Sequence, residues 1–247
     1  MVPAAIRHIA AVLALCLGLA SQAAAEACRS ESFEGEDYIV CSFDAVGADM
    51  RVFWRGGDGE PYRTFAALAE ELRGQGKSLA FAMNGGMYDD AYAPVGLYVE
   101  KGVEEKPANT ADADGNFHMK PNGVFYIGEE DAGVMETEAF LTSRPPADFA
   151  TQSGPMLVID GKIHPRFIPG SEFIKRRNGV GVSGGTVHFA ISEGSVNFDE
   201  FARLFRDRLG CDSALFLDGG SAPGLYAPEM NRNDAWRSFG PIVGVVE

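Results

Sequence analysis

Two strand-like segments of the chain each end in a short polar residue followed by two glycines. The run LAFAMNGG closes on Asn84, Gly85 and Gly86, and the run ALFLDGG closes on Asp218, Gly219 and Gly220, with Ser221 next. A carboxylate can act as a general base or stabilise a cationic centre, and paired glycines let a ligand approach backbone N–H groups. Asp-Gly is also a common turn pair, but a turn does not need two glycines, so the pattern favours a ligand site.

An amphipathic segment precedes each of these strands. Residues 64–73 predict a helix with Thr64 as its N-cap, and residues 198–209 predict another, begun by a capping-box pattern at Asn197 and Glu200. The chain thus carries a weak helix–strand repeat that delivers an amide once and a carboxylate once. If the two strands lie side by side, Asn84 and Asp218 converge on one rim; the alternative is chance similarity of two amphipathic units.

Polar and basic side chains gather in two further turns. His118, Lys120 and Asn122 fall within HMKPN, just before a strand, and Arg177 ends the basic cluster KRR. These are either solvated loops or phosphate contacts, and the planar fork of arginine fits two phosphate oxygens. Scarce cations in an acidic chain favour the phosphate reading, with Arg177 preferred because it adjoins a strand.

Three more residues are candidates for the same site. Ser153 and Gly154 lie in TQSGP before a strand, where a constrained turn offers donors to a ligand or merely forms a loop. A nucleophilic role for Ser153 is disfavoured because the Gly-x-Ser-x-Gly pattern is absent. Glu193 ends the segment TVHFAIS and is a candidate partner for Asp218.

Most of the remaining sequence predicts antiparallel strands. Glycine-containing pairs suited to two-residue hairpin turns follow or separate apolar segments; they are Lys101-Gly102, Asp160-Gly161 and Gly184-Gly185. Such short connections exclude a doubly wound parallel sheet. We predict an α+β fold, a mixed and largely antiparallel sheet with two principal helices packed on it.

The N-terminus predicts export. Arg7, an apolar run over 9–20 and small residues at 23–25 indicate a signal peptide over 1–25. We expect one domain over 26–247, and we expect the mature protein to be periplasmic or secreted. No later segment predicts membrane insertion. The net charge of −14 argues against nucleic acid or an anionic membrane as partner.

The cysteines fit an exported chain. An oxidising compartment permits disulfides, and Cys28 and Cys41 have a spacing that a hairpin can bridge, so we expect them to pair. Cys211 is expected to be a buried free thiol. His164 and His188 are expected to be structural, since the sequence shows no metal-ligand spacing.

Taken in order, the motifs resemble the phosphodiester glycosidase family over nearly all of residues 38–246. The similar segments are NGGMY, PNGVFY, SGPMLV, RNGVGV, FARLFRDRLGCDSALFLDGG and GPIVGVV. The resemblance implies hydrolysis of a sugar–phosphodiester bond without a cofactor. In that scheme Asp218 is the base or stabiliser, Arg177 holds the phosphate with Lys120 or His118, and Asn84 and Ser153 orient sugar hydroxyls.

Two alternatives stay open at the level of sequence. One is a non-catalytic envelope protein that binds cell-wall or exopolysaccharide glycans through the same rim. The other is a metal-dependent phosphodiesterase using Asp89, Asp90 and Asp218, for which the sequence offers no ligand spacing.

Overall fold

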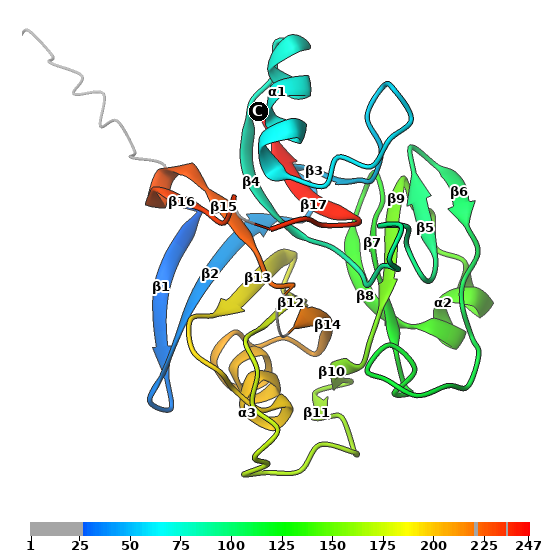
Figure 1. The fold of residues 1–247 in the computed structure, drawn as a ribbon. Helices are drawn as coiled ribbons and strands as arrows, with labels where there is room; N and C mark the ends of the chain where they lie inside the picture. Colours follow the sequence, from blue (N-terminus) through cyan, green and yellow to red (C-terminus); the bar gives the residue numbers. More distant parts are fainter. Residues whose placement is uncertain (1–26, 220–221, 236) are drawn as a thin grey trace, which may run out of the picture.

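Three antiparallel sheets make up most of the computed structural model, which describes residues 27–219, 222–235 and 237–247 (Figure 1). The seven-stranded sheet consists, in spatial order, of β1 (Cys28–Phe33), β2 (Glu36–Asp44), β13 (Thr186–Ser192), β12 (Arg177–Ser183), β14 (Ser213–Gly219), β10 (Met156–Ile159) and β11 (Lys162–Ile163). The second sheet consists of β16 (Arg232–Asn233), β15 (Leu225–Ala227), β4 (Leu79–Asn84), β17 (Ile242–Val246) and β3 (Asp49–Phe53). The third consists of β6 (Val103–Lys106), β5 (Tyr98–Glu100), β9 (Phe149–Ser153), β7 (Gly123–Ile127) and β8 (Ala132–Glu136).

One central core is shared by all three sheets. Its buried side chains come from the inward faces of each, and include Val180, Leu215, Met83, Val243 and Phe125. Alternation along the strands sends the intervening residues outward. The sheets therefore enclose a single apolar interior rather than three separate ones.

A helix covers the outer face of each sheet. In Figure 1, α1 (Phe65–Gly74) lies on the second sheet, α2 (Thr137–Ser143) on the third, and α3 (Phe198–Arg203) below the seven-stranded sheet. The predicted caps are confirmed: Thr64 Oγ1 accepts a hydrogen bond from Ala67 N, and Asn197 forms a capping box with Glu200.

The expectation of two principal helices was incomplete. The fold is α+β but dominated by strands. Its described part holds three α-helices, and α2 is the one that the sequence did not predict. That helix has only seven residues, and Glu136 serves as its N-cap in place of the residues that usually signal a helix start. The second predicted helix also changes form, since α3 passes into a π-helical turn, η1 (Leu204–Arg208).

The three predicted hairpin turns are present. The two residues of each pair are the central residues of a turn, and both have positive φ, for example 48° at Asp160 and 72° at Gly161. That backbone is the one that matches the right-handed twist of adjoining strands. Sequence alone thus located the turns of β5–β6, β10–β11 and β12–β13.

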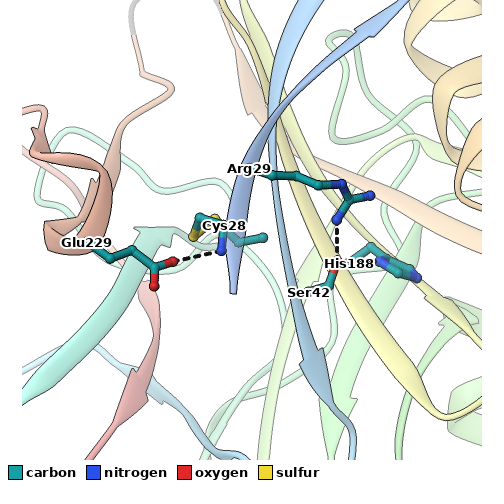
Figure 2. The surroundings of a disulfide bond; sticks show 6 residues. Cys28, Arg29, Ser42, His188 and Glu229 are labelled. Atoms are coloured by element: carbon teal, nitrogen blue, oxygen red, sulfur yellow. Dashed lines mark hydrogen bonds between the residues drawn. A yellow bond between two sulfur atoms is a disulfide. The ribbon is translucent and has the colours of Figure 1, made fainter. Parts of the chain in front are cut away.

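The predicted disulfide joins Cys28 of β1 to Cys41 of β2, which face each other in the register (Figure 2). Cys28 N also donates to Glu229 Oε1 at 2.7 Å, tying β1 to the 3-10 turn η2 (Pro228–Met230). Nearby, His188 Nδ1 and Ser42 Oγ are 2.9 Å apart, which gives this histidine a structural partner. Cys211 is a buried free thiol, as expected.

Two further expectations from the sequence concern the order of the strands and the N-terminal segment. The strands that end in Asn84 and Asp218 do not lie side by side, because β4 and β14 belong to different sheets. The proposed signal peptide lies outside the described residues. Among the helices that the structure describes, none combines the length and apolarity needed to cross a bilayer.

Candidate active site

The ends of β12 and β14 lie opposite one another and open into a cavity. Arg177 pairs with Gly219 in the register, and Asn178 pairs with Asp218. The cavity has a volume of about 470 Å³. It is lined by Asn116, Met119, Arg166, Phe167, Ile168, Ser171, Phe173, Lys175, Arg177, Phe198, Asp218 and Gly219.

Strand alternation decides which side chains reach this cavity. Leu215 and Leu217 point into the central core, whereas Phe216 packs on the outer face below α3. Asp218 follows in the outward direction and lines the cavity. A carboxylate is thus placed at the edge of a separate apolar cluster, which lies between the seven-stranded sheet and α3 and contains Phe216 and Phe201.

Arg177 is a buried cation without an acidic partner. It is 3% exposed, and no ion pair joins it to a carboxylate among the described residues. Its Nε donates to Val196 O at 2.9 Å and one Nη2 hydrogen to Phe173 O at 3.1 Å, while its guanidinium carbon lies 3.6 Å from the Phe198 ring centroid. Burial lowers the pKa of Arg177 to about 10, against the raising influence of Glu200. These contacts fix the position of the guanidinium, and no carboxylate among the described residues lies within ion-pair distance of it.

Asp218 is the complementary case, a carboxyl that no ion pair joins to a cation among the described residues and whose pKa is shifted mainly by burial. Burial raises the pKa of Asp218 to about 6, and the hydrogen bond from Gly219 N to Oδ1, at 2.7 Å, opposes the shift. An ion pair with Arg177 would have lowered this pKa instead. The cavity therefore holds an acid and a cation that do not neutralise each other, a combination typical of functional sites.

Asn178 links the two polar strand ends. Its Oδ1 accepts from Asp218 N at 2.9 Å, and its Nδ2 donates to Asn84 Oδ1 at 2.9 Å and to Asn84 O at 3.2 Å. Asn84 and Asp218 thus belong to one hydrogen-bonded network even though their strands lie in different sheets. Asn84 is fully buried and its Oδ1 also accepts from Gly224 N, while its Nδ2 has no hydrogen-bond partner among the residues that the structure describes.

The glycines after Asn84 serve close packing. A Cβ at Gly86 would lie 2.3 Å from Gln152 O, and one at Gly85 would lie 3.3 Å from Pro241. Neither residue lines the cavity. Gly219 does line it, and Gly220 and Ser221 lie outside the described residues.

Residues of the SGP and PNG motifs do not line the cavity but make buried contacts with the backbone next to it. Ser153 Oγ donates to Leu217 O at 2.6 Å, next to Asp218 in the chain. Asn122 Nδ2 donates to Phe117 O at 2.8 Å, and a Cβ at Gly154 would lie 2.6 Å from Asn122 Cβ. All three are packed inside the protein, where they fix the backbone on which the lining residues stand.

The remaining candidates lie away from the cavity lining. Lys120 Nζ contacts Asp112 Oδ1 and Thr110 O, each at 2.7 Å, and His118 Nδ1 is 3.1 Å from Ala111 O. Glu193 joins an ion-pair cluster with Arg176 and Arg232. Catalytic and binding roles for these residues stay predictions.

Several side chains at the cavity were not among the site residues expected from the sequence. Phe167 and Phe198 line the cavity, Arg166 brings further positive charge, and Asn178 joins the strands. Lys175, which belongs to the basic cluster KRR, also lines the cavity. Asn178 also carried a signal, since it follows Arg177 directly and must face the opposite side of the same strand. Burial, and then the charge of Asp218, raise the pKa of Tyr88 to about 12.

The described residues do not bring metal ligands together. No group of three or more His, Cys, Asp or Glu side chains among them is arranged to hold an ion. Asp89 Oδ1 instead accepts backbone hydrogen bonds from Ala91 and Ala93. His164 is buried against Phe167, with ring centroids 4.7 Å apart, in keeping with a structural role.

Comparison with known proteins identifies the family. The family model described as phosphodiester glycosidase matches residues 77–246, which span β4 to β17. The chain belongs to the phosphodiester glycosidase family. Membership supports a hydrolase of this type, and the matched range contains every residue described above as lining the cavity.

One relative by sequence extends the comparison. The chain is 40% identical over 171 residues to the uncharacterised protein YigE of Escherichia coli K12, covering 69% of this chain and 66% of that protein. It therefore spans slightly less than two thirds of that relative.

Solved structures share the fold at low identity. The zebrafish N-acetylglucosamine-1-phosphodiester α-N-acetylglucosaminidase catalytic domain, auto-inhibited by its pro-peptide, matches with a TM-score of 0.61 at 14% identity, over 88% of this chain and 81% of that one. A hypothetical protein from Synechocystis matches with a TM-score of 0.57 at 13% identity, over 89% of this chain and 61% of that one. A putative exported protein from Burkholderia pseudomallei matches with a TM-score of 0.54 at 11% identity, over 85% and 74%.

Proposed function

We propose that this protein hydrolyses a glycosyl phosphodiester at the bond between the anomeric carbon and the phosphate oxygen. The observation that carries the proposal is Arg177, a 3% exposed residue whose guanidinium forms no ion pair within the described part of the chain, in the same cavity as Asp218. An uncompensated buried cation is costly unless an anion comes to meet it. A phosphodiester supplies that anion, and family membership supports this class of bond.

The charges of the cavity suit the departure of a phosphate. The C1–O bond breaks with its electron pair leaving on the phosphate monoester, and water forms the new bond to C1. Asp218 accepts the proton of that water or stabilises the oxocarbenium-like centre. Arg177 stabilises the charge that grows on the phosphate. Because a phosphate monoester leaves readily, a second carboxyl acting as a strong acid is less necessary than in ordinary glycosidases.

The roles of the supporting residues follow from their contacts. Asn84, Asn178 and Ser153 position Asp218 through hydrogen bonds to its backbone neighbours and to each other. Glu193 holds Arg176 and Arg232 at the base of β12. We further propose that the enzyme works outside the cytoplasm, where the Cys28–Cys41 disulfide is stable.

The test is turnover of a panel of UDP-sugars and synthetic methyl glycosyl phosphates by the wild-type protein and two variants. Asp218→Asn is expected to lower kcat by about 10²-fold or more because the base is removed. Arg177→Lys is expected to lower kcat/KM because lysine cannot reproduce the planar fork. Release of free sugar and phosphate monoester is the measurement, and circular dichroism checks that the fold is kept.

Asp207→Asn is the matched control, because Asp207 is a surface carboxylate paired with Arg206. It should turn over each diester at the wild-type rate. Near-wild-type turnover by Asp218→Asn would contradict the assignment. Binding of glycans with no turnover of any diester would favour the alternative, a non-catalytic envelope protein.

A further inference from the structure

The segment from Ile168 to Ile174 exposes an unusual amount of apolar surface. Ile168 is 68% exposed, Phe173 80% and Ile174 49%, and only two other large hydrophobic residues in the described part of the chain, Val46 and Val103, are comparably exposed. We call Ile168, Phe173 and Ile174 the apolar lip. Exposed apolar side chains that cluster in this way mark binding surfaces more often than those scattered singly.

The apolar lip is continuous with the candidate active site. Ile168 and Phe173 line the same cavity as Asp218 and Arg177. Its backbone is held in place, since Phe173 O accepts from Arg177 Nη2 at 3.1 Å and Ser171 O accepts from Asn197 Nδ2 at 3.3 Å. The lip and the two charged residues therefore border one cavity.

The two aromatic rings deeper in the cavity, Phe167 and Phe198, already stack on other groups. The Phe198 ring stacks on Phe167 at 4.8 Å and carries Arg177 at 3.6 Å. Phe167 in turn stacks on His164 at 4.7 Å. Two of the three lip residues, Ile168 and Ile174, are aliphatic and offer no π surface, and Phe173 adds one exposed ring. A mainly aliphatic surface of this kind suits a hydrocarbon chain.

The charges beside the lip suit a phosphate. Arg166 and Lys175 line the cavity and form no ion pair with the residues that the structure describes. They stand with Arg177 at one place in a chain of net charge −14. A ligand that brings a phosphate to these cations and a hydrocarbon chain to the lip satisfies both features.

We propose that the substrate is a lipid-linked sugar phosphate, in which the phosphodiester joins a sugar to an alkyl or isoprenoid chain that lies on the apolar lip. The inference rests on the proposed function and names the class of its leaving group. Hydrolysis then yields a free sugar and an alkyl or isoprenoid phosphate.

The experiment compares a methyl and a dodecyl ester of the same glycosyl phosphate, both below the micelle concentration of the dodecyl ester. The wild-type kcat/KM should be at least about tenfold higher for the dodecyl ester, because several methylene groups are buried. In the triple variant Ile168→Ser, Phe173→Ser, Ile174→Ser this ratio should fall toward 1. Val46→Ser with Val103→Ser, at exposed positions away from the cavity, should keep the wild-type ratio.

Other outcomes overturn the inference. Equal kcat/KM for the two esters, or a ratio that survives the triple variant, excludes the lip as a chain site. Phe173→Leu should keep the ratio, and its loss there would show ring stacking instead. Sedimentation with phosphatidylglycerol vesicles that lack the glycolipid tests the other occupant: binding by the wild type but not by the triple variant would make the lip a membrane contact.

Failure of the lip and failure of the proposed function give different results. If neither ester is hydrolysed, the proposed function fails. Calorimetric titration with dodecyl phosphate then decides the lip by itself, since tighter binding than methyl phosphate should disappear in the triple variant. Equal affinities for the two phosphates would overturn the inference.

Discussion

Asp218, the proposed base, has a pKa that burial raises. Raising its pKa from 3.8 to about 6 corresponds to about 3 kcal/mol at neutral pH. The sign is unfavourable for folding, because the folded state holds the proton more tightly and stability falls as pH rises from about 4 to about 6. A structural carboxylate would gain stability from a partner, so the cost fits a catalytic role.

The same shifts predict the pH dependence of hydrolysis. Asp218 must be ionised to act as a base, so kcat/KM should fall as pH drops through about 6. Arg177 must be charged to hold phosphate, and its pKa is about 10, so activity should also fall above that pH. A pH–rate profile from 4 to 11 is the measurement. Glu193→Gln should keep the acid limb near 6, and a limb near 4 would contradict the assignment to Asp218.

At the scale of elements, the site depends on how β4, β12 and β14 meet. Strand pairing brings β12 and β14 together, but β4 comes from another sheet, and the Asn178 side chain joins them. Buried and part-buried hydrogen bonds of this kind are costly to break, because each partner is left unsatisfied. Asn178 is therefore a positioning residue for both strand ends.

Removing that bridge should affect stability and activity together. Asn178→Ala leaves Asp218 N without its acceptor and removes the donor to Asn84, so we expect about 1–3 kcal/mol of destabilisation in urea unfolding. The acid limb of the pH profile should also move from about 6, because the Asp218 backbone loses its anchor. Asn233→Ala, at an exposed site on β16, is the control. An unmoved limb would assign Asn178 a structural role alone.

Local rules predicted these elements better than their arrangement. The Asp160-Gly161 turn and the Asn197 capping box depend on a few neighbouring residues, so the sequence was sufficient to locate them. The partner strands of β4 could not be read in this way. Its neighbours β15 and β17 lie more than 130 residues further along the chain.

At the scale of the whole molecule, three sheets close around one core and the disulfide secures an edge. Cys28 and Cys41 join the two strands at the far edge of the seven-stranded sheet, with β13 and β12 between them and β14. The hydrogen bond from Cys28 N to Glu229 links β1 to the segment between β15 and β16 of the second sheet. The disulfide thus stabilises the fold at a distance from the cavity.

Removing the disulfide should therefore change stability without changing the chemistry. The bond closes a segment with a sequence separation of 13, so Cys28→Ser with Cys41→Ser should lower the free energy of unfolding by about 3 kcal/mol. Denaturant unfolding measures the loss, and the acid limb of the pH profile should stay near 6. Cys211→Ser is the comparison for loss of a thiol alone. A displaced acid limb in the double variant would show that the edge is coupled to the site.

The sequence by itself determined the features set by short-range forces: the helix caps, the hairpin turns, the Cys28–Cys41 pairing and the strand ends that carry Asn84 and Asp218. Only the tertiary structure decided which charges meet. It paired Lys120 with Asp112 on the surface, turned Arg177 into the cavity, and used Asn178 to join strands of different sheets. The reason is physical, because burial and electrostatic pairing depend on segments brought together from far along the chain, and no local pattern encodes that contact.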